Sequence, residues 1–416
     1  MMLNRTVPAL SVVLSVLCCC TVLNFTARAD ITTVDPGSIG LDAAKLSEVR
    51  QAIAKDVADG KLPGAVMLIA RRGKVGFFEA AGFQTPQKKR PMTSKTIFRM
   101  YSMTKPIVSV ATMSLVEEGR LRLDEPISSY IPYFAETTVF QQAGSSFMIK
   151  VDGARPALKQ ITVRDLMRHT SGMIYGVFDK GALGKMYKAA GAASSDIDLN
   201  QFSDVMAKLP LRFEPGTAWH YGRSTDVLGR VIEIAAGQPL DEFLAARIFR
   251  PLGMTGTAFF HDADKAGRIA QGVKPLFNVT EPKPMLSGGG GLTSTMEDYL
   301  RFTMMLRNRG SLDGKRIIKP ETLALMTQNH IAGLDRQFFY PGKAYGFGLG
   351  FAVRIGNEGA HYPGTLGDFW WRGYAGTYFW VDPCKDLFAI LLIQDPAKRR
   401  HYTVAARNWV YNALVD

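Results

Sequence analysis

The chain of 416 residues has almost no cysteine with which to cross-link a folded domain. Three of its four cysteines, Cys18, Cys19 and Cys20, lie within the first 30 residues, and only Cys384 follows them. A single thiol cannot close an internal disulfide, so a disulfide-stabilised scaffold is excluded. A lone cysteine is most often a small buried hydrophobic residue, and we expect this of Cys384.

Several catalytic and binding motifs are also missing. No Gly-x-Ser-x-Gly occurs, which argues against the nucleophile elbow of α/β-hydrolases. The six histidines show no metal-ligand spacing, and the glycine-rich stretch 287–294 lacks the Gly-Lys-Ser/Thr ending of a phosphate loop. The formal net charge is +13, yet the longest basic run is Lys88-Lys89-Arg90 and no nucleic-acid motif is present. We therefore expect no metal, no other cofactor and no nucleic-acid partner.

The first thirty residues have the pattern of an export signal. Arg5 provides a positive start, residues 7–23 are mostly apolar, and Ala27-Arg28-Ala29 is an A-x-A cleavage site. We expect a signal peptide over 1–29 and a single domain over 30–416, with no integral membrane span after cleavage. The protein would then be periplasmic or secreted; the alternative is a leader retained as an anchor.

The hydrophobic pattern places strands near both ends of the chain. Residues 65–82 are predicted to form two strands joined by a tight turn, and further strands are predicted over 345–355, 376–383 and 387–395. Strands joined as hairpins favour an antiparallel sheet. We expect an α/β fold of the α+β type, with this sheet flanked by N- and C-terminal helices. A mostly helical region, roughly 121–284, would be inserted, and a cleft beside it is the natural place for a site.

Capping signals mark individual helices. Thr162 with Asp165 predicts one helix start, and Ser294 with Glu297 predicts another. The glycines that precede Ser294 are expected to let the chain approach the sheet closely.

Ser102 and Lys105 stand three residues apart at the start of an apolar stretch, FRMYSMTKPIVSV, that is predicted to be helical. Residues i and i+3 share one face of a helix, and Pro106 is tolerated in a first turn. Burial disfavours the charged form of a lysine, and a neutral amine can take the proton of a serine hydroxyl. The alternative is a solvated surface lysine, since one Ser-x-x-Lys match is expected by chance in a chain of this length.

Several blocks, in order, resemble the serine β-lactamase-like superfamily: TIFRMYSMTKPIVSVATMSLVEEGRLRLDEPISSYIP, ITVRDLMRHTSGM, EPGTAWHYGRSTDVLGRVIE, GGGGLTSTMEDYLRF and WRGYAGTYFWVDP. This superfamily includes class C β-lactamases, D-alanyl-D-alanine carboxypeptidases and family VIII carboxylesterases. The resemblance covers about residues 97–383. It implies that Ser102 is the nucleophile and that Lys105 and Tyr221 move its proton. It also implies that the backbone N–H groups of Ser102 and Tyr374 bind the oxyanion.

Two departures separate the chain from the lactam-cleaving members. Arg223 stands where they carry an asparagine, and a cationic side chain cannot accept a hydrogen bond from a substrate amide. Trp371-Arg372-Gly373 stands where they carry Lys-Thr-Gly, and similar Trp-x-Gly triplets occur in the family VIII esterases. We expect Trp371 to form a flat apolar wall of the substrate site. We also expect Gly373 to let substrate lie along the strand, and Arg372 to point to the opposite face.

The sequence thus predicts a serine hydrolase, closest to family VIII carboxylesterases, that acts through an acyl-enzyme on short-chain carboxylic esters. Its substrate-binding residues would be Trp371, Gly373 and Arg223, and its partner a small-molecule ester or amide. The alternatives are a β-lactamase or D-alanyl-D-alanine carboxypeptidase, and a non-hydrolysing penicillin-binding or scaffolding protein. The natural substrate and the oligomeric state remain open.

Overall fold

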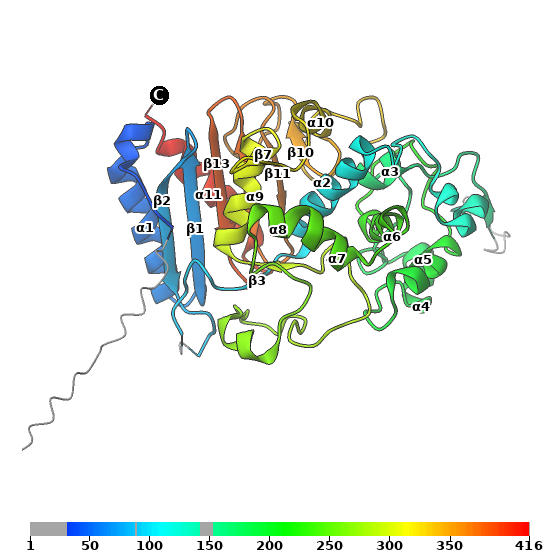
Figure 1. The fold of residues 1–416 in the computed structure, drawn as a ribbon, viewed down its shortest axis with the longest axis horizontal. Helices are drawn as coiled ribbons and strands as arrows, with labels where there is room; N and C mark the ends of the chain where they lie inside the picture. The colour runs from blue at the N-terminus through cyan, green and yellow to red at the C-terminus, as the bar shows by residue number, and fades with distance from the viewer. Residues whose placement is uncertain (1–30, 88–89, 142–152, 416) are drawn as a thin grey trace, which may run out of the picture.

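A seven-stranded sheet, with every neighbouring pair antiparallel, forms the centre of the molecule (Figure 1). The computed structural model describes residues 31–87, 90–141 and 153–415, so the predicted leader lies outside the described residues. In spatial order the strands are β2 (Lys74–Gly82), β1 (Gly64–Arg71), β13 (Leu387–Leu392), β12 (Tyr378–Asp382), β11 (Phe369–Arg372), β10 (Ala352–Arg354) and β9 (Tyr345–Phe347).

The two ends of the chain meet inside this sheet. Strand β1 pairs with β13, with Leu68 opposite Ile390, and β2 extends the sheet beyond β1. All eight residues of β1 are buried, because helices cover both faces of the sheet. The predicted α/β fold of the α+β type, built on an antiparallel sheet, is therefore confirmed.

Helices from both ends of the chain pack together on one face of the sheet. Helix α1 (Ala43–Ala58) contacts β2 and α11 (Arg399–Asn412), and the N–H of Asp42 donates to the carbonyl of Ala413 at 2.8 Å. Helix α9 (Met296–Arg307) packs against β12 and β13 from the other side (Figure 1).

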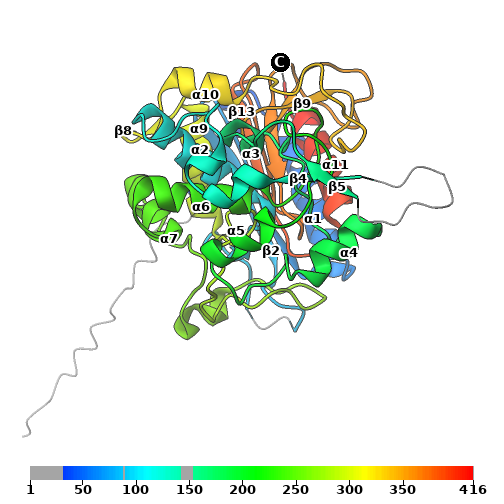
Figure 2. The same cartoon turned by 90° about the vertical axis from the view of Figure 1, so that its right-hand side faces the viewer.

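The segment between α2 (Thr104–Glu117) and β6 (Thr293–Ser294) contains mostly helices and long loops, at the side of the molecule away from α1 (Figures 1 and 2). Thr162 and Asp165 form the predicted capping box. The helices of this segment are α3 (Val163–Met167), α4 (Ala182–Ala189), α5 (Leu199–Ala207), α6 (Ser224–Ala236), α7 (Leu240–Leu244) and α8 (Arg250–Leu252).

Two local expectations are wrong. The start of α9 is capped by Thr295, whose side chain accepts from the N–H of Asp298, because Ser294 is still part of β6. Cys384 is exposed, since it lies in the turn between β12 and β13 and not in a strand.

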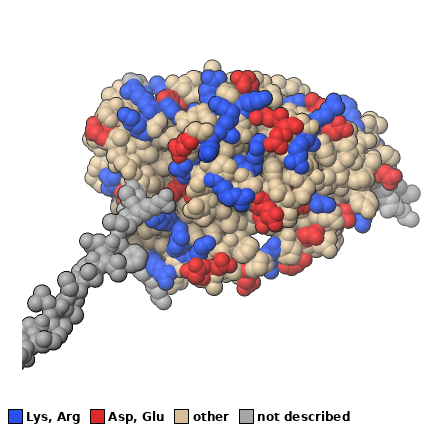
Figure 3. All heavy atoms as spheres, viewed as in Figure 1, with Lys and Arg blue, Asp and Glu red and all other residues tan. Residues whose placement is uncertain are grey.

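The surface carries charges of both signs. Lysine and arginine side chains are interspersed with aspartate and glutamate on the face shown in Figure 3. Within the described ranges, no helix is both long enough and apolar enough to span a membrane.

Candidate active site

A tight turn presents Ser102 at the start of helix α2. The chain leaves β3 (Phe98–Arg99), makes a 3-10 turn over Tyr101–Met103 and continues directly into the helix. Tyr101 has a φ of +47°, in the left-handed region that residues with a side chain seldom adopt. The predicted helix start near Ser102 is confirmed, with the serine itself in the 3-10 turn.

Lys105 is buried beneath this turn, with only 1% of its surface exposed. Its Nζ lies 3.3 Å from Ser102 Oγ, 2.8 Å from the hydroxyl of Tyr175 and 2.6 Å from the carbonyl oxygen of Gly289. These three oxygens surround the amine inside the protein. The alternative of a solvated surface lysine is therefore wrong.

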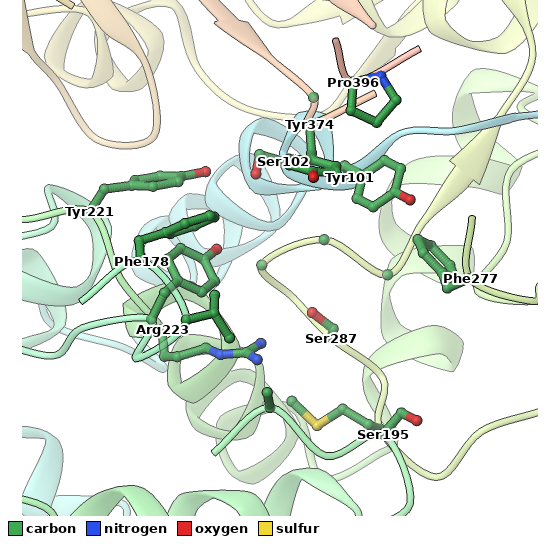
Figure 4. A pocket seen from close by; sticks show the side chains of 18 of the residues that line it. Tyr101, Ser102, Phe178, Ser195, Tyr221, Arg223, Phe277, Ser287, Tyr374 and Pro396 are labelled. Carbon is green, nitrogen blue, oxygen red and sulfur yellow. The ribbon is translucent and has the colours of Figure 1, made fainter. Parts of the chain in front are cut away.

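Two tyrosines surround the lysine in different ways. Tyr221 places its ring face 4.6 Å from Lys105 Nζ, and its hydroxyl points toward Ser102 (Figure 4). That hydroxyl is buried and makes no hydrogen bond with any described residue. Tyr175 instead accepts directly from Lys105, and burial raises the pKa of its phenol well above the ordinary value. Tyr175 is therefore a neutral phenol at physiological pH.

Tyr175 was not among the residues expected from the sequence. It stands four residues after Ser171 in the block RHTSGMIY, so its place directly after a recognisable motif is a signal that could have found it. No periodicity marks it, because it lies in a loop outside the helices and strands.

His169 is a buried neighbour of Tyr221. Its ring is 4.8 Å from that of Tyr221, and the residue is almost completely buried. Burial lowers the pKa of His169 well below its ordinary value, and the charge of Lys105 acts in the same direction. His169 is therefore neutral and adds no positive charge to the site.

The glycine-rich loop 287–291 supplies the third acceptor of Lys105. A Cβ on Gly288 would lie 2.5 Å from the carbonyl oxygen of Thr225, and one on Gly289 would lie 2.7 Å from a carboxylate oxygen of Asp226. These glycines therefore allow close approach to the start of α6, and the expected approach to the sheet is wrong.

The resemblance implied two backbone N–H groups, those of Ser102 and Tyr374, as donors to an oxyanion. Neither the Ser102 nor the Tyr374 N–H donates a hydrogen bond to another residue in the described part of the chain. Gly373 connects the end of β11 to Tyr374. It cannot carry a side chain, because a Cβ would lie 2.1 Å from Thr377 Oγ1 and 2.4 Å from the carbonyl oxygen of Met100. Both N–H groups belong to residues that line one cavity.

The end of strand β11 is oriented differently from the sequence expectation. Trp371 has no exposed surface and packs against Tyr221, with 5.4 Å between ring centres. It does not line the cavity, so it is a packing partner of Tyr221 and not the expected apolar wall. Arg372 is the one that lines the cavity, with its guanidinium 5.6 Å from the Tyr340 ring centre. Strand β11 ends at Arg372, whose guanidinium also lies 5.9 Å from the ring centre of Trp370.

The cavity has a volume of about 1420 Å³ and opens onto Ser102 (Figure 4). Arg223 lines it, but its guanidinium is already paired with Asp226 at 3.3 Å. No cluster of histidine, cysteine or acidic side chains suited to a metal occurs among the residues with described positions. Aromatic side chains dominate the wall: Tyr101, Tyr175, Phe178, Tyr221, Phe259, Phe260, Phe277, Phe338, Tyr340 and Tyr374.

A helix-covered antiparallel sheet, with a serine and a buried lysine three residues apart at the edge of a cavity, defines the class of β-lactamase-related serine hydrolases. The chain belongs to the Beta-lactamase family, whose profile matches residues 49–411. The resemblance found in the sequence is therefore confirmed.

Relatives of this family match nearly the whole chain. Protein Rv1367c of Mycobacterium tuberculosis is 33% identical over 368 residues, which cover 83% of this chain and 89% of the relative. Esterase EstB of Burkholderia gladioli is 32% identical over 412 residues, covering 91% and 98%. Among solved structures, EstCE1, described as a hydrolase with promiscuous acyltransferase activity, superposes with a TM-score of 0.74 at 27% identity, covering 88% of this chain and 99% of that one.

Proposed function

We propose that this protein is a carboxylesterase that hydrolyses short-chain esters through an acyl-enzyme on Ser102. The observation that carries the proposal is the buried amine of Lys105, 3.3 Å from the Ser102 hydroxyl. A serine hydroxyl is a weak nucleophile until a base removes its proton, and this amine is within reach to do so. The similarity to Esterase EstB supports esters as the substrate class.

Acylation proceeds in two proton transfers. The Ser102 oxygen bonds to the ester carbonyl carbon while its proton passes to Lys105, and the oxyanion accepts from the free N–H groups of Ser102 and Tyr374. Collapse of this intermediate breaks the bond to the alcohol oxygen. The alcohol leaves with a proton that passes from Lys105 through Tyr221, whose hydroxyl has no other partner. Each oxyanion donor is worth about 100- to 1000-fold in rate.

Deacylation reverses these roles. Water attacks the acyl carbon and gives a proton to the Lys105–Tyr221 pair, and the bond to Ser102 oxygen breaks. The proton returns to that oxygen as the carboxylic acid leaves. Tyr175 holds Lys105 by its hydrogen bond throughout, and no cofactor takes part in either step.

A panel of p-nitrophenyl esters of increasing acyl length, assayed beside a chromogenic cephalosporin, tests the proposal. We expect rapid turnover of acetate and butyrate esters, little turnover of the cephalosporin, and no activity in Ser102→Ala. Faster cephalosporin cleavage would favour the β-lactamase or D-alanyl-D-alanine carboxypeptidase alternative. A single stoichiometric burst without turnover would favour a non-hydrolysing penicillin-binding or scaffolding protein.

Acyl transfer to an alcohol is a second candidate function, and the size of the cavity favours it. Drug-sized sites occupy about 300–1000 Å³, so a cavity of about 1420 Å³ has room for a short ester and a second alcohol molecule. The described activity of EstCE1 supports the same reading. Product analysis at rising butanol concentration would measure it, because transfer yields the butyl ester at the expense of the acid.

We also propose a periplasmic or secreted location, supported by the A-x-A site at Ala27-Arg28-Ala29. Amino-terminal sequencing of the protein recovered from its native host would give Asp30 as the first residue if the leader is removed.

A further inference from the structure

A fully buried carboxylate lies beside the site and has no part in the proton transfers above. Asp226, in the first turn of α6, has no exposed surface. Its Oδ1 accepts from the N–H of Gly289 at 3.0 Å and from the hydroxyl of Ser287 at 2.5 Å, while Oδ2 pairs with Arg223 at 3.3 Å. A buried charge is tolerated only with such partners, so each contact restricts where the carboxylate and its partners can lie.

One residue joins this carboxylate to the lysine. Gly289 gives its N–H to Asp226 and accepts from Lys105 Nζ through its own carbonyl oxygen at 2.6 Å. The loop around it contains four consecutive glycines, Gly288 to Gly291, which have the widest backbone freedom of any residue. Within the loop, the N–H groups of Gly290 and Gly291 donate to the carbonyl oxygen of Ser287, whereas the N–H of Gly289 has its partner outside the loop, in Asp226. The bond to Asp226 therefore ties the residue that carries this carbonyl to helix α6.

We propose that Asp226 is a positioning residue for the reaction: by holding the N–H of Gly289 it keeps the carbonyl of Gly289 against Lys105, and so keeps Lys105 Nζ within reach of Ser102. The inference rests on the proposed function, in which Lys105 is the base. If the bond between Asp226 and Gly289 is removed, Lys105 keeps its hydrogen bond to Tyr175, but the carbonyl of Gly289 can move away from Lys105 Nζ. A displacement of about 1 Å in a catalytic group can lower a rate about 100-fold.

The test measures how fast Ser102 reacts and how many molecules react. Full-length wild type, Asp226→Asn and Asp226→Ala are treated with a fluorophosphonate, which bonds to the nucleophile and releases fluoride. We expect Asp226→Ala to lower the second-order rate constant about 100-fold with final labelling still one per chain. Asp226→Asn should lower this rate constant by a smaller factor, because its amide oxygen still accepts from Gly289 and Ser287. Only the charge pairing with Arg223 is lost. The KM for p-nitrophenyl butyrate should stay unchanged in both.

Asp298 offers a matched control. It is also buried and also accepts from a glycine N–H and a hydroxyl, those of Gly256 and Thr257 at 2.8 and 2.7 Å, but it does not line the cavity. Asp298→Asn should lower the melting temperature and leave the rate constant of labelling unchanged.

A purely structural role for Asp226 gives a different pattern, in which fewer molecules are labelled but each reacts at the wild-type rate. That pattern would overturn the inference. If Asp226→Ala does not fold, the rate constant of Asp226→Asn decides, and a wild-type value overturns the inference. Ester turnover by Ser102→Ala would instead overturn the proposed function, whatever the Asp226 variants do.

Discussion

The hydroxyl of Tyr175 lies 2.8 Å from the amine of Lys105, so two tyrosines, not one, contact the lysine beside Ser102. Their environments differ, because Tyr175 is hydrogen-bonded to Lys105 whereas the hydroxyl of Tyr221 is buried without a partner in the described structure. A proton donor for a departing alcohol must be free to reach it, and this favours Tyr221 for the transfer and Tyr175 for holding the lysine.

Removing either phenol hydroxyl should separate these two roles. Tyr221→Phe should lower kcat for p-nitrophenyl butyrate by about 100-fold or more, the range of a general acid–base group. Tyr175→Phe removes one hydrogen bond to the amine that becomes charged when it takes the proton of Ser102. Such a bond is worth about 1.5–3 kcal/mol, so kcat should fall about 10- to 100-fold. The substitution Tyr187→Phe, at a buried tyrosine whose hydroxyl donates to the carbonyl of Pro210, is the control. A larger loss in Tyr175→Phe than in Tyr221→Phe would reverse the assignment.

Arg372 should favour substrates that carry a negative charge. It lines the cavity and has neither an ion pair nor a hydrogen bond among residues 31–87, 90–141 and 153–415. Guanidinium groups bind carboxylates through paired N–H donors. We therefore expect Arg372→Gln to raise the KM of a p-nitrophenyl hemisuccinate ester while that of p-nitrophenyl butyrate changes little. Equal changes for both esters would contradict this.

Gly373 should tolerate no side chain. The Cβ of Gly373→Ala would collide with Thr377 Oγ1 and the carbonyl of Met100, and the following N–H, of Tyr374, would move with the backbone. We expect kcat to fall about 100- to 1000-fold, as when one oxyanion donor is lost. Gly356→Ala is the matched control, because no atom lies within 4 Å of its added Cβ. Wild-type kcat in Gly373→Ala would exclude the Tyr374 N–H as a donor.

Acid should destabilise the protein through His261. Burial lowers the pKa of this side chain to about 4, and its Nε2 is 2.7 Å from Thr293 Oγ1. An unfolded histidine titrates near pH 6.5, so between about pH 6.5 and 4 the unfolded chain binds a proton that the folded chain does not. The contribution is complete above pH 6.5 and is lost as the pH falls toward 4.

Urea unfolding at pH 7 and pH 4.5 would measure this effect. Between these conditions the free energy of unfolding of wild type should fall by up to roughly 3 kcal/mol more than that of His261→Gln. His361→Gln, at an exposed histidine, should follow wild type. Equal pH dependence in wild type and His261→Gln would contradict the assignment.

The sheet and the contact between Ser102 and Lys105 could be predicted because their signals are local. Alternating and continuous apolar runs identified the strands that meet as β1 and β13, and the spacing of Ser102 and Lys105 placed both at a helix start. The helix cap at Thr295 was missed by one residue, because Ser294 and Thr295 are both good capping residues and only strand pairing decides between them.

The remaining site residues depend on tertiary contacts that no local pattern encodes. Tyr175 reaches Lys105 from a loop 70 residues away, and Asp226 accepts from a glycine loop more than 60 residues further along the chain. The alternation of a strand predicts Trp371 and Arg372 on opposite faces, whereas both side chains lie near the ring of Tyr340. The alternation could not say which of the two meets the cavity.

Trapping the acyl-enzyme tests the role of Ser102 most directly. Protein mixed with excess p-nitrophenyl butyrate and quenched in acid within the first turnovers would be digested and examined by mass spectrometry. We expect a butyryl group on the peptide that contains Ser102, and none in Ser102→Ala or on any other residue. Full esterase activity with an unmodified Ser102, or with the acyl group on another side chain, would contradict it.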